Sequence, residues 1–153
     1  MSYIYKKNLS IMFKFILVIF SSVTSFATLA QNPDEVVNAF FEALNSKDHE
    51  ALEILTVHDM KIHSLKLGDS VTISSQTAKE FIEGIKSMPE EVTIFEKIID
   101  SDSIISEHLA QFTLPYEFYV NGKLSHRGTN VMTLLKTKSG WKVSYVADTR
   151  ESS

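Results

Sequence analysis

His126 is the side chain that the sequence places best for chemistry. It lies within a predicted strand, and Asn130 falls on the same face because alternate residues of a strand point the same way. The dipeptide Asn121-Gly122 predicts a two-residue hairpin that would set His126 beside Tyr116 or Phe118. An imidazole titrates near neutral pH, so beside a phenol it could act as an acid, a base or a ligand anchor. The alternative is a core histidine that hydrogen-bonds Asn130 or Tyr116 and has no further role.

These residues are expected to line a pocket. Even-numbered residues of the two longest predicted strands share one face, which should lie beneath the helices. A pocket of this kind, largely apolar with a few polar groups, is typical of small-molecule sites. The predicted pocket residues are Phe40, Tyr116, Phe118, His126 and Asn130, and the best catalytic candidate among them is His126.

The remaining histidines give weaker cases. His108 should share the inward face of the strand that carries Tyr116. His58-Asp59 and His63 surround a short predicted strand, but their spacing matches no metal-binding pattern. The chain has no cysteine, so thiolate ligands and cysteine nucleophiles are excluded. We therefore expect neither a metal site nor a cofactor.

Two charged pairs have more than one interpretation. Asp148 and Arg150 share one face of the last predicted strand, which we expect to point outward, where an ion pair contributes little. Alternatively, the end of this strand forms the pocket mouth and Arg150 receives an anionic ligand. Glu117 and Arg127, both outward on neighbouring strands, could pair across the sheet or across a dimer interface.

The first thirty residues have the pattern of a cleavable signal peptide. Three lysines precede an apolar run over Phe15–Phe20, and small residues follow up to Ala30. The apolar run is shorter than the roughly 20 residues that span a bilayer, which disfavours a retained anchor. We expect cleavage before Gln31 or before Thr28, and a periplasmic or secreted protein without a membrane segment after cleavage.

Residues 31–153 are predicted to form a single domain, large enough to bury one core. Removal of residues 1–30 takes away three lysines and no acid, so the net charge changes from −4 to −7. An acidic chain without a basic stripe is not expected to bind nucleic acid. Without cysteines there are no disulfides, so the fold depends on packing alone.

Three amphipathic helices are predicted before the long strands. Asn32 and Pro33 form a helix start, with Asn32 as the N-cap and Pro33 in the first turn. Asp48 caps a shorter second helix. A third helix is expected over Thr77–Met88, ended by Pro89.

The remaining segments predict strands. Short strands over Met60–Leu65 and Val71–Ile73 lie between the second and third helices, and Val92–Ile99 follows the third. Ile104–Val120 then alternates as one long strand before the hairpin. In the last strand we expect Trp141, Val143, Tyr145 and Ala147 to face inward.

This order of elements resembles the nuclear transport factor 2-like superfamily, and in particular its small bacterial members of the SnoaL-like or lumazine-binding type. The resemblance covers Pro33–Arg150. The segments that carry it are Phe41–Asp48, the hairpin Tyr116–His126, Thr133–Lys136 and Gly140–Val143. It implies an α+β fold shaped like a cone, in which a curved, mostly antiparallel sheet wraps over three N-terminal helices and encloses a cavity.

The resemblance also bears on activity and assembly. The tyrosine and the two aspartates of ketosteroid isomerases would fall at Phe40, Ser64 and Val131, so the resemblance does not imply that activity. Members of the superfamily frequently dimerise through the outer face of the sheet, which implies a homodimer here. Such a face would be mixed in character, with Thr113, Glu117, Tyr119, Arg127, Thr129 and Val131.

Three functions remain open from the sequence. The first is an exported domain that binds a small molecule between the sheet and the helices. The second is a cofactor-independent lyase, hydrolase or isomerase that uses His126 with Tyr116 or Asn130. The third is an interaction module that dimerises through its sheet. A pocket in which His126 is buried against a second titratable group would favour the enzyme, and a filled core would favour the interaction module.

Overall fold

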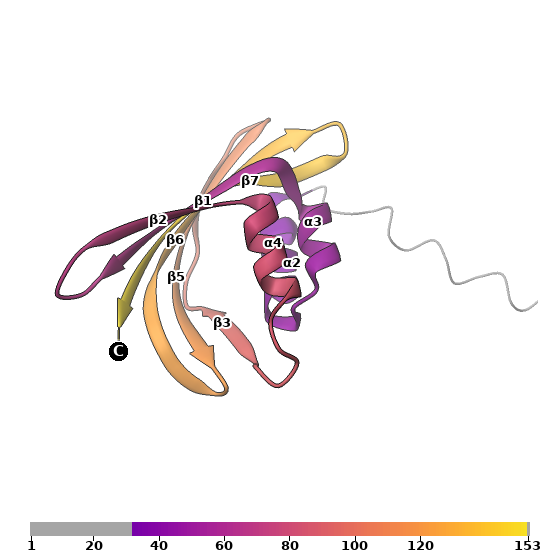
Figure 1. The fold of residues 1–153 in the computed structure, drawn as a ribbon. Coiled ribbons are helices and arrows are strands. Elements are labelled where there is room, and N and C mark those ends of the chain that lie inside the picture. Colours follow the sequence, from indigo (N-terminus) through magenta and orange to yellow (C-terminus); the bar gives the residue numbers. More distant parts are fainter. Residues whose placement is uncertain (1–31, 153) are drawn as a thin grey trace, which may run out of the picture.

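The computed structural model describes residues 32–152 of the chain. The signal peptide predicted over residues 1–30, with its cleavage sites, lies outside the described residues. Three helices, α2 (Pro33–Ser46), α3 (His49–Leu55) and α4 (Ala78–Lys86), gather on one face of a curved sheet (Figure 1). We call this the inner face of the sheet, and the opposite one the outer face.

The strands form one seven-stranded sheet, whose order in space differs from the order in the chain. They are β1 (Thr56–Leu67), β2 (Thr72–Thr77), β3 (Ile94–Ile98), β4 (Asp102–Ile105), β5 (Leu109–Val120), β6 (Lys123–Thr137) and β7 (Gly140–Ser152). The order is β2-β1-β7-β6-β5-β3, with β4 paired to β5. Strands β1 and β7 are parallel and the other neighbours antiparallel. The predicted architecture, helices under a curved and mostly antiparallel α+β sheet, is confirmed.

The helix starts follow from their capping residues. Asn32 accepts a hydrogen bond from the backbone N–H of Asp34, and Asp48 accepts one from that of Ala51. Thr77 and Glu80 form a reciprocal capping box at the start of α4. The two predicted caps, Asn32 and Asp48, are therefore confirmed, whereas the third helix begins one residue after Thr77 and ends two residues before Met88.

The predicted single strand over Ile104–Val120 is wrong. The chain turns back after β4, and this turn is closed by hydrogen bonds from Ser106 to Leu109 and from Leu109 to Ser106. β4 then pairs antiparallel with β5. His108 lies in the turn with its side chain 71% exposed, so the expectation that it faces inward is wrong too.

The hairpin between β5 and β6 forms where Asn121 and Gly122 predict it. Their φ angles are 51° and 74°, as a type I′ turn requires. A register shift after the turn sets His126 directly opposite Phe118. The inner face of β5 is buried, as its alternation predicts.

A β-bulge in β7 changes which residues face inward. Thr133 pairs with Tyr145 but Leu134 pairs with Val143, so Ser144 is an extra residue in β7. Beyond the bulge Val146 is buried and Tyr145 is exposed. The expectation that Tyr145 and Ala147 face inward is therefore wrong.

The core lies between the helices and the inner face of the sheet. Val36, Phe40 and Leu44 form the buried stripe of α2. The sheet contributes fully buried side chains such as Phe112 and Leu134. Within residues 32–152, no helix has the length and apolar character needed to cross a bilayer.

Candidate functional site

A cavity of about 160 Å³ lies between the inner face of the sheet and helices α2 and α4. Most of its wall is apolar and aromatic. The ring of Phe40 stacks on Phe81 of α4, with 6.0 Å between the centroids, and meets Phe41 edge-on. From the sheet, Phe118 and Met132 complete this wall.

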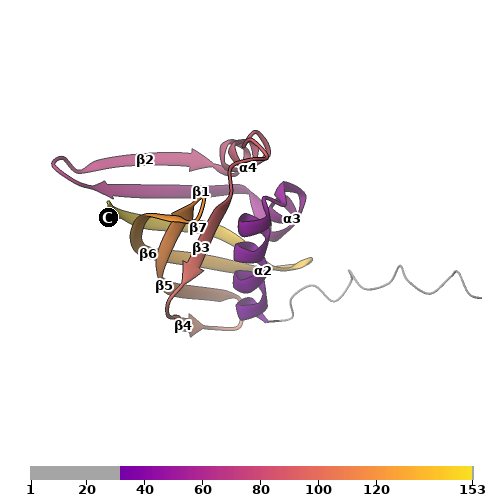
Figure 2. The same cartoon turned by 90° about the horizontal axis from the view of Figure 1, so that it is seen from below.

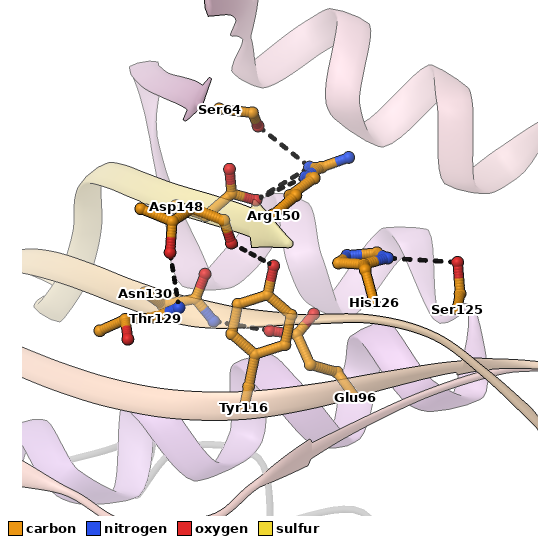
Figure 3. Close-up of polar contacts among 10 residues, drawn as sticks. Ser64, Glu96, Tyr116, Ser125, His126, Thr129, Asn130, Asp148 and Arg150 are labelled. Atoms are coloured by element: carbon orange, nitrogen blue, oxygen red, sulfur yellow. Dashed lines mark hydrogen bonds and ion pairs between the residues drawn. The ribbon is translucent and has the colours of Figure 1, made fainter. Parts of the chain in front are cut away.

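Asp148 and Arg150 lie at the polar end of the cavity, contrary to the prediction that they face outward. The physical reason is the bulge at Ser144, after which even-numbered residues of β7 face inward. Arg150 donates through Nε to Asp148 Oδ2 at 2.9 Å and through a terminal nitrogen to Ser64 Oγ at 3.0 Å (Figure 3). The Asp148 side chain is 9% exposed, whereas that of Arg150 is 42% exposed.

One oxygen of this pair lacks a partner. Oδ1 of Asp148 is buried and accepts no hydrogen bond from any of the described residues. A buried carboxylate oxygen without a donor costs free energy, so Asp148 is an expensive residue at this end of the cavity.

Glu96 adds a second carboxyl group to the same end of the cavity. Its Oε1 accepts a hydrogen bond of 2.6 Å from Nδ2 of Asn130. Burial raises the pKa of Glu96 from 4.5 to about 7, an effect to which Asp148 adds and which the bond from Asn130 and the charge of Arg150 oppose. This carboxyl group can therefore take up and release a proton near neutral pH.

The C-terminal turn of α2 fixes the position of Glu96. Asn45 makes two hydrogen bonds to the Glu96 backbone, one to its carbonyl at 3.1 Å and one from its N–H at 2.7 Å. Lys47, in the left-handed conformation with φ 56°, donates to three carbonyls of the loop that leads into β3, among them that of Val92 at 2.8 Å. The segment that ends the helix thus also anchors the strand of the candidate site.

Tyr116 reaches across β6 toward β7. Its hydroxyl donates to the carbonyl of Thr149 at 3.0 Å, and burial, followed by the charges of Asp148 and Glu96, raises the pKa of Tyr116 above its ordinary value. Gly128, directly opposite Tyr116 in β6, makes this contact possible. A Cβ at Gly128 would lie 1.7 Å from the Thr149 oxygen.

His126 lies at the rim of this cluster. Its ring stacks on Phe118, with 4.9 Å between centroids, and meets Tyr116 edge-on at 5.8 Å. Nδ1 is 3.2 Å from the hydroxyl of Ser125. Burial, followed by the charge of Arg150, lowers the pKa of His126, so the imidazole is neutral at pH 7.

All five predicted pocket residues, Phe40, Tyr116, Phe118, His126 and Asn130, line the cavity. The predicted hydrogen bonds between them do not form. Asn130 donates to Glu96 and Tyr116 donates to Thr149, so neither of them bonds to His126.

Sequence reasoning missed Glu96, although a signal was present. It alternates with Ile94 and Ile98 on β3, which puts an acid on the same strand face as two apolar residues. Such a pattern indicates a carboxyl group that points toward the core.

Among the described residues, no three or more acidic or histidine side chains are grouped as a metal ion would require. His58 and Asp59 line a separate groove beside α3 and α4. His63 is bonded to Tyr145 at 3.2 Å.

Comparison with solved structures identifies the fold. A nuclear transport factor 2-like protein from Cytophaga hutchinsonii superposes with a TM-score of 0.62 at 16% identity, over 78% of this chain and 99% of that one. A protein of the same superfamily from Salmonella enterica gives 0.61 at 11% identity, over 78% and 88% of the two chains. A "putative dehydratase from the NTF2-like family" from Streptomyces avermitilis gives 0.58 at 16% identity, over 77% and 92%.

The chain thus has the nuclear transport factor 2-like fold, as the sequence predicted. No protein-family model and no curated protein matches the sequence. The more specific likeness to SnoaL-like members stays a prediction.

Proposed function

We propose that this protein binds a small molecule with an apolar body and a polar head group in the cavity described above. One observation carries the proposal: an aromatic cavity ends at a cluster of Glu96, Asn130 and Asp148. Burying a carboxyl group lowers the free energy of unfolding, and an apolar residue of similar size would stabilise the core better. Such groups are therefore characteristic of sites that serve a ligand or a reaction.

The size of the cavity limits the ligand. Its volume of about 160 Å³ is close to that of an engineered protein cavity, roughly 150 Å³, that binds benzene. Pockets for drug-sized molecules measure about 300–1,000 Å³. The ligand should therefore be about the size of one ring with a short substituent.

Native mass spectrometry of protein purified from its own source tests this proposal. We expect a bound small molecule, and we expect His126→Ala to weaken its binding by about 1–3 kcal/mol through loss of a directional contact. Phe40→Ala should instead lower the free energy of unfolding by roughly 3–5 kcal/mol, because Phe40 is a buried core side chain.

The two variants separate a site residue from a core residue. If His126→Ala lowers the melting temperature as much as Phe40→Ala does and leaves the affinity unchanged, His126 is structural. His126 would then no longer support the proposed binding site.

A second candidate function is proton-transfer catalysis by a small lyase or isomerase. The observation that favours it is the Glu96 carboxyl group, whose pKa of about 7 suits a general acid or base. One structural neighbour carries the description of a putative dehydratase. In this version Glu96 replaces the predicted pairing of His126 with Tyr116 or Asn130 as the proton-transfer group.

Deuterium uptake from solvent tests the catalytic version. Phenylacetone, a one-ring ketone, should exchange its α-hydrogens faster with the protein than in buffer, because the Glu96 carboxylate takes the proton and returns deuterium. Glu96→Gln should abolish the acceleration. Equal rates for the two proteins would rule out Glu96 as the base.

We also propose that the protein is exported to the periplasm or secreted. The support is the N-terminal pattern of three lysines, the apolar run Phe15–Phe20 and the small residues before Gln31. N-terminal sequencing of the native protein should therefore begin at Gln31 or Thr28. A native protein that begins at Met1 would contradict export by cleavage.

A further inference from the structure

We infer that the head group of the ligand is a cation, a primary or secondary ammonium group that the carboxyl groups of Glu96 and Asp148 recognise. The inference rests on the proposed function of the cavity and names the class of compound that the cavity accepts. It follows from the balance of hydrogen-bond acceptors, donors and charges at the polar end.

The acceptors at this end are not all used. Asp148 Oδ1 is buried and accepts no bond from the described residues. Glu96 uses Oε1 to accept from Asn130, so its second oxygen remains for another donor. Both carboxyl groups line the cavity, from strands on opposite sides of β6, and the second oxygen of Glu96 is the acceptor that they offer there.

Most of the donors, in contrast, already have acceptors within the protein. Tyr116 donates its hydroxyl hydrogen to Thr149, and the Asn130 amide donates to Glu96. Arg150 donates through Nε to Asp148 and through one terminal nitrogen to Ser64, so its second terminal nitrogen is the donor that remains, on a side chain 42% exposed. A ligand that supplies hydrogen-bond donors therefore fits this end better than one that needs them.

Charge favours a cation in the same way. Two carboxyl groups, Glu96 and Asp148, face one guanidinium group, that of Arg150, and the imidazole of His126 is neutral. When Glu96 is ionised, the cluster thus has one uncompensated negative charge. The aromatic rings of Phe40, Phe81 and Phe118 form the adjoining wall, and aromatic faces attract cations.

An anionic ligand at Arg150 is the rival interpretation. Arg150 is 42% exposed at the cavity mouth, but its Nε and one terminal nitrogen are held by Asp148 at 2.9 Å. An anion there would meet the charge of Asp148 next to that of Arg150. Hydrogen bonds and charge therefore favour the cation over the anion.

Three probes of nearly equal size separate these possibilities: benzylammonium, benzyl alcohol and benzoate. Isothermal titration of the full protein at pH 8 should show benzylammonium binding at least about tenfold more tightly than benzyl alcohol, and benzoate more weakly than both. The affinity for benzylammonium should fall as the pH decreases from 8 to 6, because Glu96 then becomes protonated. The affinity for benzyl alcohol should not follow this change.

Variants assign the effect to the carboxyl groups. Glu96→Gln and Asp148→Asn should each reduce the preference for benzylammonium over benzyl alcohol. Glu107→Gln is the matched control, since its side chain is 84% exposed and outside the cavity, and it should leave the preference unchanged. If a variant fails to fold, the relative affinities of the wild-type protein for the three probes still test the cation inference.

Each outcome has one meaning. Benzyl alcohol or benzoate binding as tightly as benzylammonium overturns the cation inference and leaves the small-molecule proposal supported. Failure of all three one-ring probes to bind at millimolar concentration overturns both. A preference for benzylammonium that Glu107→Gln reduces as much as Glu96→Gln does would also overturn the inference.

Discussion

Glu96 places a carboxyl group at the cavity, where burial changes its pKa. Its carboxyl group is held at the cavity by the Asn45 contacts to its backbone and by the bond from Asn130. Burial raises the pKa of Glu96 to about 7, so the folded state favours its protonated form although the bond from Asn130 opposes this effect. The unfolded chain ionises this group at its ordinary value of 4.5.

The sign of the resulting pH dependence is fixed by that difference. Between pH 4.5 and 7 the native state binds more protons at Glu96 than the unfolded state does, so stability falls as the pH rises. The contribution of Glu96 to the free energy of unfolding is fully present below pH 4.5. It amounts to roughly 3 kcal/mol and is lost as the pH rises through 7.

Glu96→Gln should remove this loss, so the free energy of unfolding of the variant should decline less between pH 5 and pH 8. Chemical denaturation at several pH values measures it, with Glu107→Gln as the control that keeps the wild-type slope. Identical slopes for wild type and Glu96→Gln would show that Glu96 titrates at its ordinary pKa.

At this scale the sequence predicted part of the candidate site. Tyr116, Phe118 and His126 follow from strict alternation along long strands, and they line the cavity. Glu96 was missed, because its alternation with Ile94 and Ile98 covers only the five residues of β3 and is a weaker signal than those of the long strands. Hydrogen-bond partners could not be predicted either, since they depend on distances between strands that pattern does not encode.

At the scale of elements, the caps and the hairpin were predictable and the bulge was not. The capping side chains and the Asn121-Gly122 turn can be predicted directly, because only a few residue types favour these positions. The bulge has no such signal. Nothing in the residue types around Val143 indicates that Ser144 is an extra residue and that the alternation of inward and outward side chains shifts after it. One extra residue therefore decided that Asp148 lies in the cavity.

The close approach of β6 and β7 gives a prediction at this scale. Gly128→Ala places a Cβ against the Thr149 carbonyl, which is backbone and cannot rotate away. We expect destabilisation of at least about 1–3 kcal/mol, the usual cost of overpacking. Denaturant unfolding monitored by circular dichroism measures it.

Gly84→Ala is the matched control. Gly84 lies in α4 with nothing within 4 Å of the added Cβ. Alanine is the better helix former, so this variant should gain about 0.5–1 kcal/mol. Equal effects of the two substitutions would contradict the tight approach at Gly128.

At the scale of the whole molecule, the outer face of the sheet is a candidate for self-association. A shallow apolar groove on it is lined by Leu65, Ile73, Val131 and Ala147, among others. The Glu117–Arg127 pair predicted for this face forms within the chain at 3.1 Å. It therefore needs no partner subunit.

We propose a homodimer through this face and predict a dimeric sedimentation profile at tens of micromolar, where micromolar complexes are populated. Val131→Lys should shift the profile to monomer by placing a charge in the groove. Ile54→Lys, on helix α3 at the inner face and 54% exposed before substitution, is the control and should remain dimeric. A monomeric wild-type profile at these concentrations would count against the dimer.

The position of β7 has a consequence for the time course of folding. β7 lies between β1 and β6, and Ile62 pairs with Val146, 84 positions further along the chain. Pairings between such distant residues form slowly, roughly in milliseconds to seconds, because loop closure must precede them. Within the described sheet, β7 joins the pair β1–β2 to the strands β3–β6, and Asp148 and Arg150 arrive with it. The candidate site, which includes Asp148 and Arg150, would thus be completed only at the final step of sheet assembly.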